Sequence, residues 1–224
     1  MNLRKPRLFI FLLFIFSFSA HSMDLKGLNI PENAMKKSKG KTILVVAKKE
    51  YLIYVLDKET KSILAQFPVS LGMNPGRKIL RGDKKTPEGI YFIREILSDA
   101  QTIQSQSYQK LKQMNSIYWK ASDGHYKYGK PDKDLGKNAY GPRVFKLDYP
   151  NSDDKELFSR LKKEQKIPAN SQLEKWMGLH GTNDPESIQK NVSSGCIRLL
   201  NHDLILLGQY VEKGTMVIIL PSGD

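Results

Sequence analysis

Residues 177–203 read MGLHGTNDPESIQKNVSSGCIRLLNHD and contain the single cysteine of the 224-residue chain, Cys196. His180 lies sixteen residues before this cysteine, and Arg198 lies two residues after it. A thiol attacks as its thiolate, and a nearby imidazole or cation favours that form. The apolar run at residues 176–179 predicts a strand that ends at the imidazole. We interpret Cys196 as a candidate nucleophile and His180 as the group that takes up and returns its proton.

The residues around the cysteine suit a turn that stabilises an oxyanion. Ser193, Ser194 and Gly195 are small, and the glycine can adopt dihedral angles closed to residues with a Cβ atom. Such a turn aims successive backbone N–H groups at one point. We expect Gly195 and Cys196 to provide these groups, with Ser194 as a further candidate. Arg198 carries a planar positive charge that suits a carboxylate, so we expect it to support the loop or to bind substrate.

Each of these side chains has a structural alternative when it is taken alone. A single cysteine is most often a small core residue, a histidine often hydrogen-bonds to backbone, and an arginine is usually a solvated surface charge. Their order within one short segment favours the catalytic interpretation. A metal site is disfavoured because the chain has four histidines and contains neither a C-x-x-C nor an H-x-x-x-H pair. We predict no metal and no cofactor.

Two groups of motifs resemble a known family. The first is HGT at residues 180–182, followed by SSGCIR at residues 193–198. The second lies upstream, with VSLG at residues 69–72 and GDKKTPEG at residues 82–89. In this order they resemble the L,D-transpeptidase family with its YkuD-type catalytic domain, over most of residues 42–220. The chain departs from the pattern at Ser194, where many members carry histidine, so no role of a second histidine is carried over.

The resemblance implies a mainly β fold, a sandwich or partly closed barrel with a few peripheral α-helices. It also implies a cysteine acyltransferase that acts on peptidoglycan tetrapeptide stems. Cys196 would attack the carbonyl of the third residue, a diamino acid such as diaminopimelate, and D-alanine would leave. His180 would carry the proton, and the carbonyl of Gly181 would orient the imidazole. The residues expected to bind the oxyanion or the substrate are Ser193, Ser194, Gly195, Arg198 and Thr182.

The acceptor of the acyl group stays open at this point. An amine of a second stem would give a 3-3 cross-link, and an amine on a lipoprotein would anchor that protein to the wall. Water would make the chain an L,D-carboxypeptidase or a cross-link hydrolase. A non-catalytic wall-binding protein is an alternative of a different class, disfavoured because Cys196, His180 and Arg198 are all present. A thiol redox protein would normally need a resolving second cysteine.

Residues 1–22 have the pattern of a cleavable secretory signal. Arg4, Lys5 and Arg7 precede an apolar run of about eleven residues, which is too short for a bilayer that needs roughly 20. We expect export to the periplasm or cell envelope with no transmembrane span after cleavage, and an uncleaved anchor is the alternative. Residues 23–41 predict a linker or N-terminal arm, followed by the catalytic domain at residues 42–221.

The charge of the chain indicates an anionic partner. The formal net charge of +13 falls to +10 when the signal is removed. No nucleic acid is expected outside the cytoplasm, so the natural candidates are the carboxylate-rich peptidoglycan or an anionic membrane surface. For any individual lysine, we favour a solvated surface position.

The apolar periodicity predicts strands and helices around the motifs. Strands are expected at residues 42–47, 51–56, 62–69, 90–96, 143–147 and 215–220. Helices are expected at residues 102–114, from an N-cap at Asn151 to about residue 166, and from a cap at Asn201 through residue 211. Residues 97–137 are interpreted as an insertion, either a lid over the cleft or a surface excursion packed on the barrel. The TPEG segment at residues 86–89 is interpreted as turn chemistry alone.

Overall fold

The computed structural model describes residues 30–222, so the expected secretory signal and the first part of the expected linker lie outside the described residues. The mainly β prediction is confirmed. The elements are α1 (Glu32–Lys37), β1 (Thr42–Ala47), η2 (Lys48–Glu50), β2 (Leu52–Asp57), β3 (Ile63–Pro68), β4 (Leu71–Gly72), β5 (Gly89–Ser98), α2 (Gln106–Ser116), η3 (Ala121–Asp123), β6 (Tyr126–Lys127), β7 (Lys130–Asp134), β8 (Arg143–Leu147), α3 (Ser152–Lys163), β9 (Gly178–His180), η4 (Pro185–Ser187), β10 (Asn191–Ser193), β11 (Ile197–Arg198), α4 (Asn201–Leu207) and β12 (Met216–Ile219).

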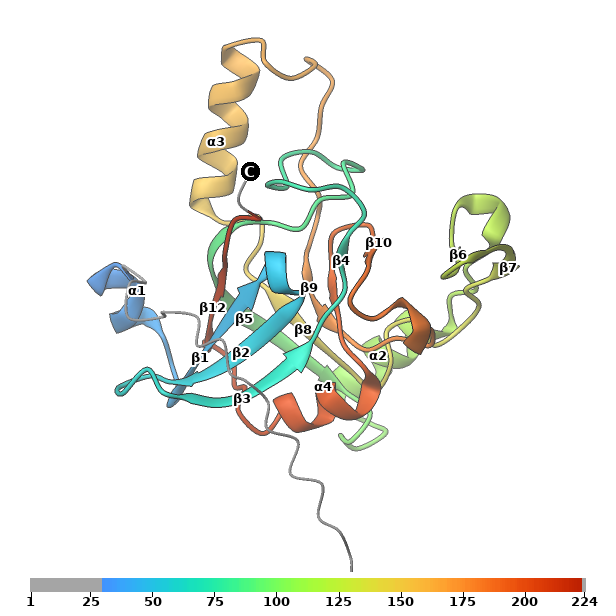
Figure 1. The fold of residues 1–224 in the computed structure, drawn as a ribbon, viewed down its shortest axis with the longest axis horizontal. Helices are drawn as coiled ribbons and strands as arrows, with labels where there is room; N and C mark the ends of the chain where they lie inside the picture. The colour runs from blue at the N-terminus through green and yellow to red at the C-terminus, as the bar shows by residue number, and fades with distance from the viewer. Residues whose placement is uncertain (1–29, 223–224) are drawn as a thin grey trace, which may run out of the picture.

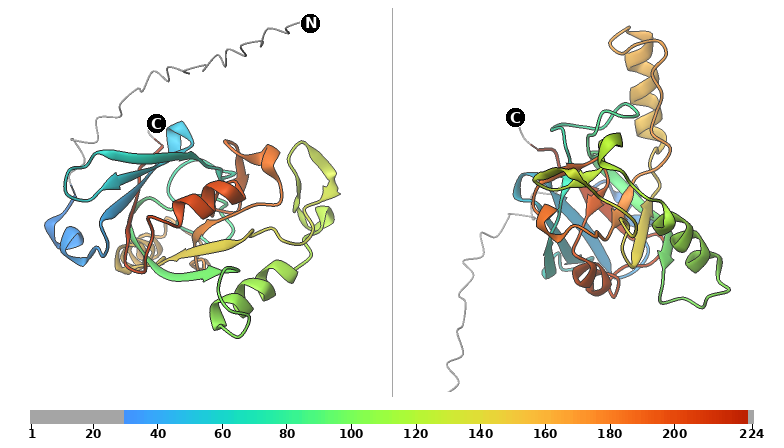
Figure 2. Two further views of the ribbon diagram at one scale, coloured as in Figure 1. Left: turned by 90° about the horizontal axis from the view of Figure 1, so that it is seen from below. Right: turned by 90° about the vertical axis from the view of Figure 1, so that its right-hand side faces the viewer.

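Eight strands form one curled sheet in the order β11-β9-β8-β5-β12-β1-β2-β3 (Figures 1 and 2). Strands β1, β2 and β3 make the expected antiparallel meander. The last strand, β12, inserts between β1 and β5, parallel to the first and antiparallel to the second. The sheet closes partway into a barrel, which confirms the predicted architecture. Strands β9 and β11 lie at one end of the sheet, where the motif residues are found.

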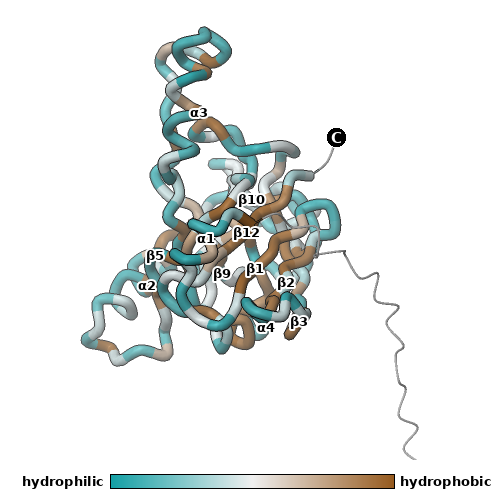
Figure 3. Tube along the Cα trace, turned by 90° about the vertical axis from the view of Figure 1, so that its left-hand side faces the viewer, coloured by the Kyte–Doolittle hydropathy of each residue, from teal (hydrophilic) through white to brown (hydrophobic). Residues whose placement is uncertain are grey.

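Strand β1 is buried on both faces, which explains why its sequence is almost entirely apolar. Leu44 and Val46 belong to the larger core cluster, whereas Ile43 and Val45 pack with Met216 in a second cluster on the other face. Each such buried aliphatic side chain contributes about 1.5–3 kcal/mol. Figure 3 shows hydrophobic colour along the central strands and hydrophilic colour along much of α3.

The helices agree with the predictions in two cases and require a correction in the third. Helix α3 begins after Asn151 with a reciprocal capping box to Asp154, and it stands away from the sheet (Figure 1). Helix α2 begins four residues later than predicted, because Ser105 provides the N-cap. Helix α4 is shorter than predicted, and the cap prediction is wrong: the N-cap position is Leu200, with no side-chain cap. The Asn201 side chain is used elsewhere, as described below.

Two lysines contradict the expectation of solvated surface positions. Lys48 is buried and its Nζ lies 2.5 Å from the Glu88 carboxylate. Lys78 is buried and its Nζ lies 2.8 Å from Asp83. The TPEG segment therefore supplies more than turn chemistry, since Glu88 belongs to it. A buried lysine is stable only when a partner compensates its charge, and both partners come from the same loop.

Among residues 30–222, no helix combines the length and apolar character that a membrane crossing requires.

Candidate active site

Strands β9 and β11 are parallel neighbours, and their register brings the motif residues together. Arg198 is the partner of His180, and Ile197 is the partner of Leu179. Because side chains alternate between the faces of a strand, the leucine and isoleucine point into the core and the two polar residues to the other face. Cys196 directly precedes β11. His180, Cys196 and Arg198 line one cavity of about 230 Å³.

The imidazole of His180 is held in one orientation by backbone. Its Nδ1 lies 2.7 Å from the carbonyl oxygen of Gly181, which directs a proton to Nδ1 and leaves the Nε2 lone pair free as an acceptor. Its ring also packs against Tyr140, with 4.9 Å between the ring centroids. Burial, and secondarily the charge of Arg198, lowers the pKa of His180 to about 3. The imidazole is therefore neutral at pH 7.

Electrostatics at Cys196 favour the thiol over the thiolate. Burial raises the pKa of Cys196 above its usual value. A hydrogen bond with the backbone of Gly178 and the charges of Arg198 and Lys78 oppose this shift without reversing it. A neutral thiol and a neutral imidazole therefore share the cavity. This corrects the simple expectation that the imidazole alone makes a resting thiolate, and it requires proton transfer when the carbonyl is attacked.

The turn before the cysteine is fixed by Ser193 and Gly195. The Ser193 hydroxyl donates to the carbonyl of Cys196 at 2.5 Å and accepts from the N–H of Gly195 at 3.0 Å. The N–H of Gly195 is thus already engaged. In the part of the chain that the structure describes, the N–H groups of Ser194 and Cys196 have no such acceptor.

Both the backbone conformation at position 195 and the close packing around it require a glycine. It has a φ of 130°, and a Cβ atom there would lie 2.5 Å from the carbonyl oxygen of Lys85. The loop that carries this carbonyl is organised by Asp83. Its carboxylate accepts from Nζ of Lys78 and from the N–H groups of Ile79, Leu80 and Lys85, all within 3.0 Å. The GDKKTPEG motif therefore packs a rigid loop against the turn of the cysteine.

Asn201 is a site residue that the sequence interpretation missed. Its Oδ1 accepts from the N–H of Thr182 at 2.9 Å. A Cβ atom on Gly181 would lie 2.2 Å from the same oxygen, so this glycine is needed for the approach. The amide thereby holds the segment that orients His180. Thr182 itself is buried and is not among the residues that line the cavity, which differs from its expected contact with substrate.

The insertion at residues 97–137 divides into two parts. Helix α2 packs on the barrel through Leu111, which is buried with Leu97 and Val144. The second part reaches the cavity, where Trp119 and His125 are lining residues. The structure thus joins an aromatic segment, distant in sequence, to the candidate site.

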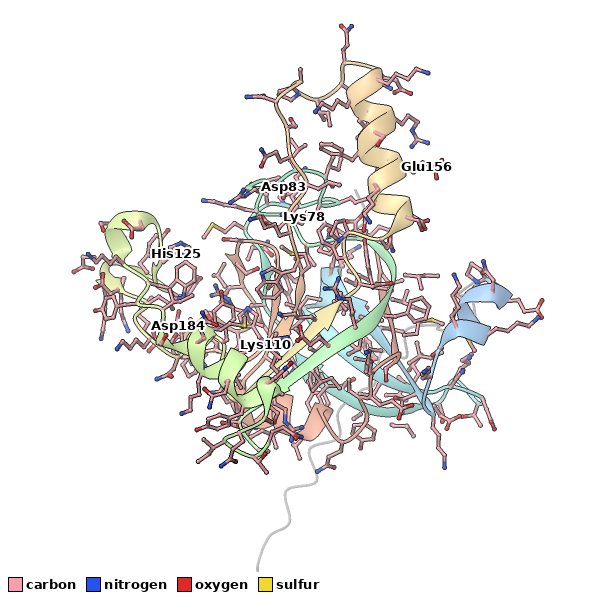
Figure 4. All side chains as sticks on the ribbon, turned by 180° about the vertical axis from the view of Figure 1, so that it is seen from behind. Lys78, Asp83, Lys110, His125, Glu156 and Asp184 are labelled. Atoms are coloured by element: carbon pink, nitrogen blue, oxygen red, sulfur yellow. The ribbon has the colours of Figure 1, made fainter. Side chains whose placement is uncertain are left out.

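A second cavity of about 590 Å³ adjoins the first. His125, Leu135, Ser194 and Arg198 line both cavities. Burial, and secondarily the charge of Arg198, lowers the pKa of His125 below its usual value. Figure 4 shows His125 on the same side of the molecule as Asp184. The hairpin β6–β7 forms the outer wall of this region.

The hairpin is attached to the loop that follows His180. The N–H of Tyr128 donates to the Asp184 carboxylate at 2.8 Å, and Lys130 pairs with Glu186 at 3.0 Å. Asn183 donates to the carbonyls of Leu135 and Lys137, both at 2.6 Å. No motif in the sequence indicates these contacts, because they join segments about 50 residues apart and all but the Lys130–Glu186 pair use a backbone atom on one side.

Across residues 30–222, no three side chains of His, Cys, Asp or Glu gather as metal ligands would.

Comparisons with known proteins agree with the geometry. The model of the YkuD family, described as the L,D-transpeptidase catalytic domain, matches residues 41–219. A putative L,D-transpeptidase YkuD of Bacillus licheniformis is 54% identical over 44 residues, which are 20% of this chain and 27% of that protein. The YkuD protein of Bacillus subtilis, also described as putative, is 57% identical over 42 residues, 19% of this chain and 26% of its own length. The matched segments therefore span about a quarter of those relatives.

Among solved structures, the helical cell shape determining protein Pgp2 of Campylobacter jejuni is similar in fold, with a TM-score of 0.50 and 16% identity. The alignment covers 86% of this chain and 56% of that one. Because the family model extends over most of the sequence, the chain belongs to the YkuD family of L,D-transpeptidase catalytic domains.

Proposed function

We propose that this chain is a peptidoglycan L,D-transpeptidase that works through a thioacyl enzyme on Cys196 and transfers a tetrapeptide stem to an amine. The observation that carries the proposal is the shared cavity, in which an oriented neutral imidazole faces the same space as the only thiol. Family membership supports the substrate class, because this domain family is described by its L,D-transpeptidase activity. The acceptor is a second stem or an amine on a lipoprotein.

Cys196 and His180 supply every group that the acylation step needs. The sulfur of Cys196 bonds to the carbonyl carbon of the third stem residue, and the bond from that carbon to the nitrogen of D-alanine breaks. Nε2 of His180 takes the thiol proton during the attack and gives it to the leaving nitrogen. In the second step the acceptor nitrogen bonds to the carbonyl carbon, the C–S bond breaks, and the acceptor proton returns to sulfur through the same imidazole.

The oxyanion is proposed to bind the N–H groups of Cys196 and Ser194. The N–H of Gly195, which we expected to take part, already donates to Ser193. Donors that are fixed before the reaction stabilise the developing charge at no cost of reorganisation. In this arrangement, Gly195 and Ser193 hold the turn in place. Arg198 binds a carboxylate of the substrate.

Mass spectrometry of the chain with purified disaccharide-tetrapeptide tests the proposal. We expect an intact-protein adduct that is lost in Cys196→Ser, together with a 3-3 linked dimer. An adduct that yields only tripeptide would replace transfer to an amine by hydrolysis, which is the carboxypeptidase alternative. A wild-type protein that binds the stem and forms neither adduct nor product would refute the nucleophile assignment and favour a wall-binding protein.

We also propose that the hairpin β6–β7 covers the site as a lid. The aromatic residues of the insertion line the cavity, and the hairpin is held to the loop after His180 by the contacts of Asp184 and Asn183. Loosening the lid with Asp184→Ala should speed alkylation of Cys196 by a bulky reagent more than by a small one. Equal effects on both reagents would contradict a lid. The exposed variant Lys155→Ala on α3 is the matched control.

The proposed substrate places the protein at the cell envelope after export, in agreement with the net positive charge of the chain. Fractionation of cells that produce the full chain, with and without residues 1–22, checks this location.

A further inference from the structure

Helix α2 turns one face toward the barrel, and three residues spaced four apart mark this face. The hydroxyl of Ser107 accepts from the N–H of Ser98 at 3.0 Å and donates to the carbonyl of Ile96 at 3.1 Å, both on β5. Leu111, one turn later, is buried. Asn115 follows in the last turn of the helix. Because residues four apart share a face of a helix, these side chains fix α2 to the barrel along its length.

The amide of Asn115 is bonded on both sides to the segment that follows the insertion. Its Oδ1 accepts from the N–H of Tyr140 at 3.0 Å, and its Nδ2 donates to the carbonyl of Gly141 at 2.8 Å. The backbone carbonyl of Asn115 also accepts from the N–H of Asn138 at 2.9 Å. A single residue of α2 therefore holds the backbone of residues 138–141.

Tyr140 and Gly141 in turn contact the groups that orient the imidazole of His180. The carbonyl of Tyr140 accepts from the N–H of Gly181 at 2.9 Å, and the Tyr140 ring packs on the imidazole with 4.9 Å between the centroids. A Cβ atom on Gly141 would lie 2.8 Å from the Cα of Gly181, so the two backbones are in close contact. The carbonyl of Gly181 lies 2.7 Å from Nδ1 of His180. The hydrogen bond that sets the tautomer therefore depends on backbone that Asn115 holds.

We propose that Asn115 is a positioning residue for His180, although it lies in the insertion and outside the motifs of the catalytic segment. Without its amide, residues 138–141 lose their link to α2, the carbonyl of Gly181 is free to turn from Nδ1, and the imidazole proton can move to Nε2. An imidazole protonated at Nε2 presents a donor where the thiol proton has to be accepted, so it cannot act as the base. The effect on the tautomer belongs to the protein alone, whereas the effect on the rate rests on the proposed acyl transfer.

The tautomer of His180 provides a test that needs no substrate. Asn115→Leu removes both side-chain hydrogen bonds and keeps a side chain of similar size. Gln113→Leu makes a comparable change at an exposed position of α2 and is the matched control. Nuclear magnetic resonance of the imidazole nitrogens reads the tautomer, and His180→Gln assigns the signals. We expect the Nδ1–H form alone in wild type and in the control, and a mixture of both forms in Asn115→Leu.

The thioacyl adduct with disaccharide-tetrapeptide provides a second readout. Its rate constant at saturating stem should fall at least about tenfold in Asn115→Leu, because an error of position at the base is costly. The stem concentration at half-maximal rate should stay within about twofold of wild type, because Asn115 is not among the residues that line the cavity. Partial unfolding would lower the rate in proportion to the folded fraction, which urea unfolding measures, but it would leave the tautomer of the folded protein unchanged.

A folded Asn115→Leu protein that keeps the single Nδ1–H tautomer would overturn the inference, whatever its rate. If this variant does not fold, Asn115→Ala removes the same amide with a smaller side chain and is judged by the same criterion. If wild type formed no adduct, the proposed acyl transfer would fail, whereas the tautomer comparison would still decide the role of Asn115. The two failures are therefore distinguishable.

Discussion

The neutral state of His180 has a thermodynamic consequence that can be measured without substrate. The folded imidazole has a pKa of about 3, against an ordinary value of 6.5. As pH falls below 6.5, the unfolded chain binds a proton that the folded chain refuses, so the free energy of unfolding decreases. From these two values, His180 should remove about 2 kcal/mol between pH 7 and pH 5, and about 4 kcal/mol in total by pH 3.

Urea unfolding at pH 7, 6 and 5, followed by tryptophan fluorescence, provides the assay. His180→Gln should flatten the pH dependence by about 2 kcal/mol relative to wild type. The exposed variant Gln113→Ala on α2, which removes no titratable group, is the control and should leave the dependence unchanged. Identical slopes in wild type and His180→Gln would refute the reasoning, because they would mean that the folded imidazole titrates normally. Nuclear magnetic resonance titration of the imidazole in the wild type reads the same pKa if the variant is too unstable to compare.

Three further substitutions test the supports of the site. His180→Ala should slow alkylation of the thiol near pH 7 by at least about tenfold, since the proton acceptor is lost, and equal alkylation rates would remove the imidazole from the role of base. Gly195→Ala should cost more than about 1 kcal/mol and abolish the adduct, whereas Gly82→Ala, which has φ of 79° but nothing within 4 Å, should leave the adduct intact. Asp83→Asn should lower the free energy of unfolding in urea by about 3–5 kcal/mol, because it leaves the charge of Lys78 buried without a partner. Adding Lys78→Met to this variant should recover part of the loss. A loss below about 1 kcal/mol, typical of an exposed pair, would show that the pair is not buried in solution.

Much of the sheet could be predicted because its signals are local. Strands β1 and β8 begin and end at the predicted residues. Each is a short run rich in apolar residues with polar or turn-forming residues on both sides, so its limits can be read from the sequence. The N-cap of α3 was equally clear from Asn151 and the acidic residues that follow it. What the sequence could not supply is the neighbour of each strand, because pairing of β12 with β1 joins the two ends of the domain.

The errors share one cause, which is a tertiary partner that overrides a local preference. Asn201 has the chemistry of a helix cap, yet its oxygen accepts from Thr182, and only the folded chain brings them together. Lys78 and Lys48 belong to a chain rich in lysine, so composition favoured surface positions. Asp83 follows Lys78 by five residues, but the partner of Lys48 is Glu88, 40 residues away, so no local signal near Lys48 indicates the pair.

The candidate site itself shows why its motifs are scattered along the chain. The imidazole sits on β9 and the thiol directly precedes β11, and these two short strands are too small to define an active-site geometry alone. Three remote segments supply the rigidity: the loop of Asp83 packs against Gly195, Asn201 fixes the backbone after His180, and the insertion is fastened to the loop beyond it. Reaction at a buried thiol with a raised pKa depends on holding a carbonyl within reach of both sulfur and imidazole, so errors of position are costly. The distant motifs therefore serve the chemistry through position, and substitutions in them should lower the rate of adduct formation even where no substrate contact is lost.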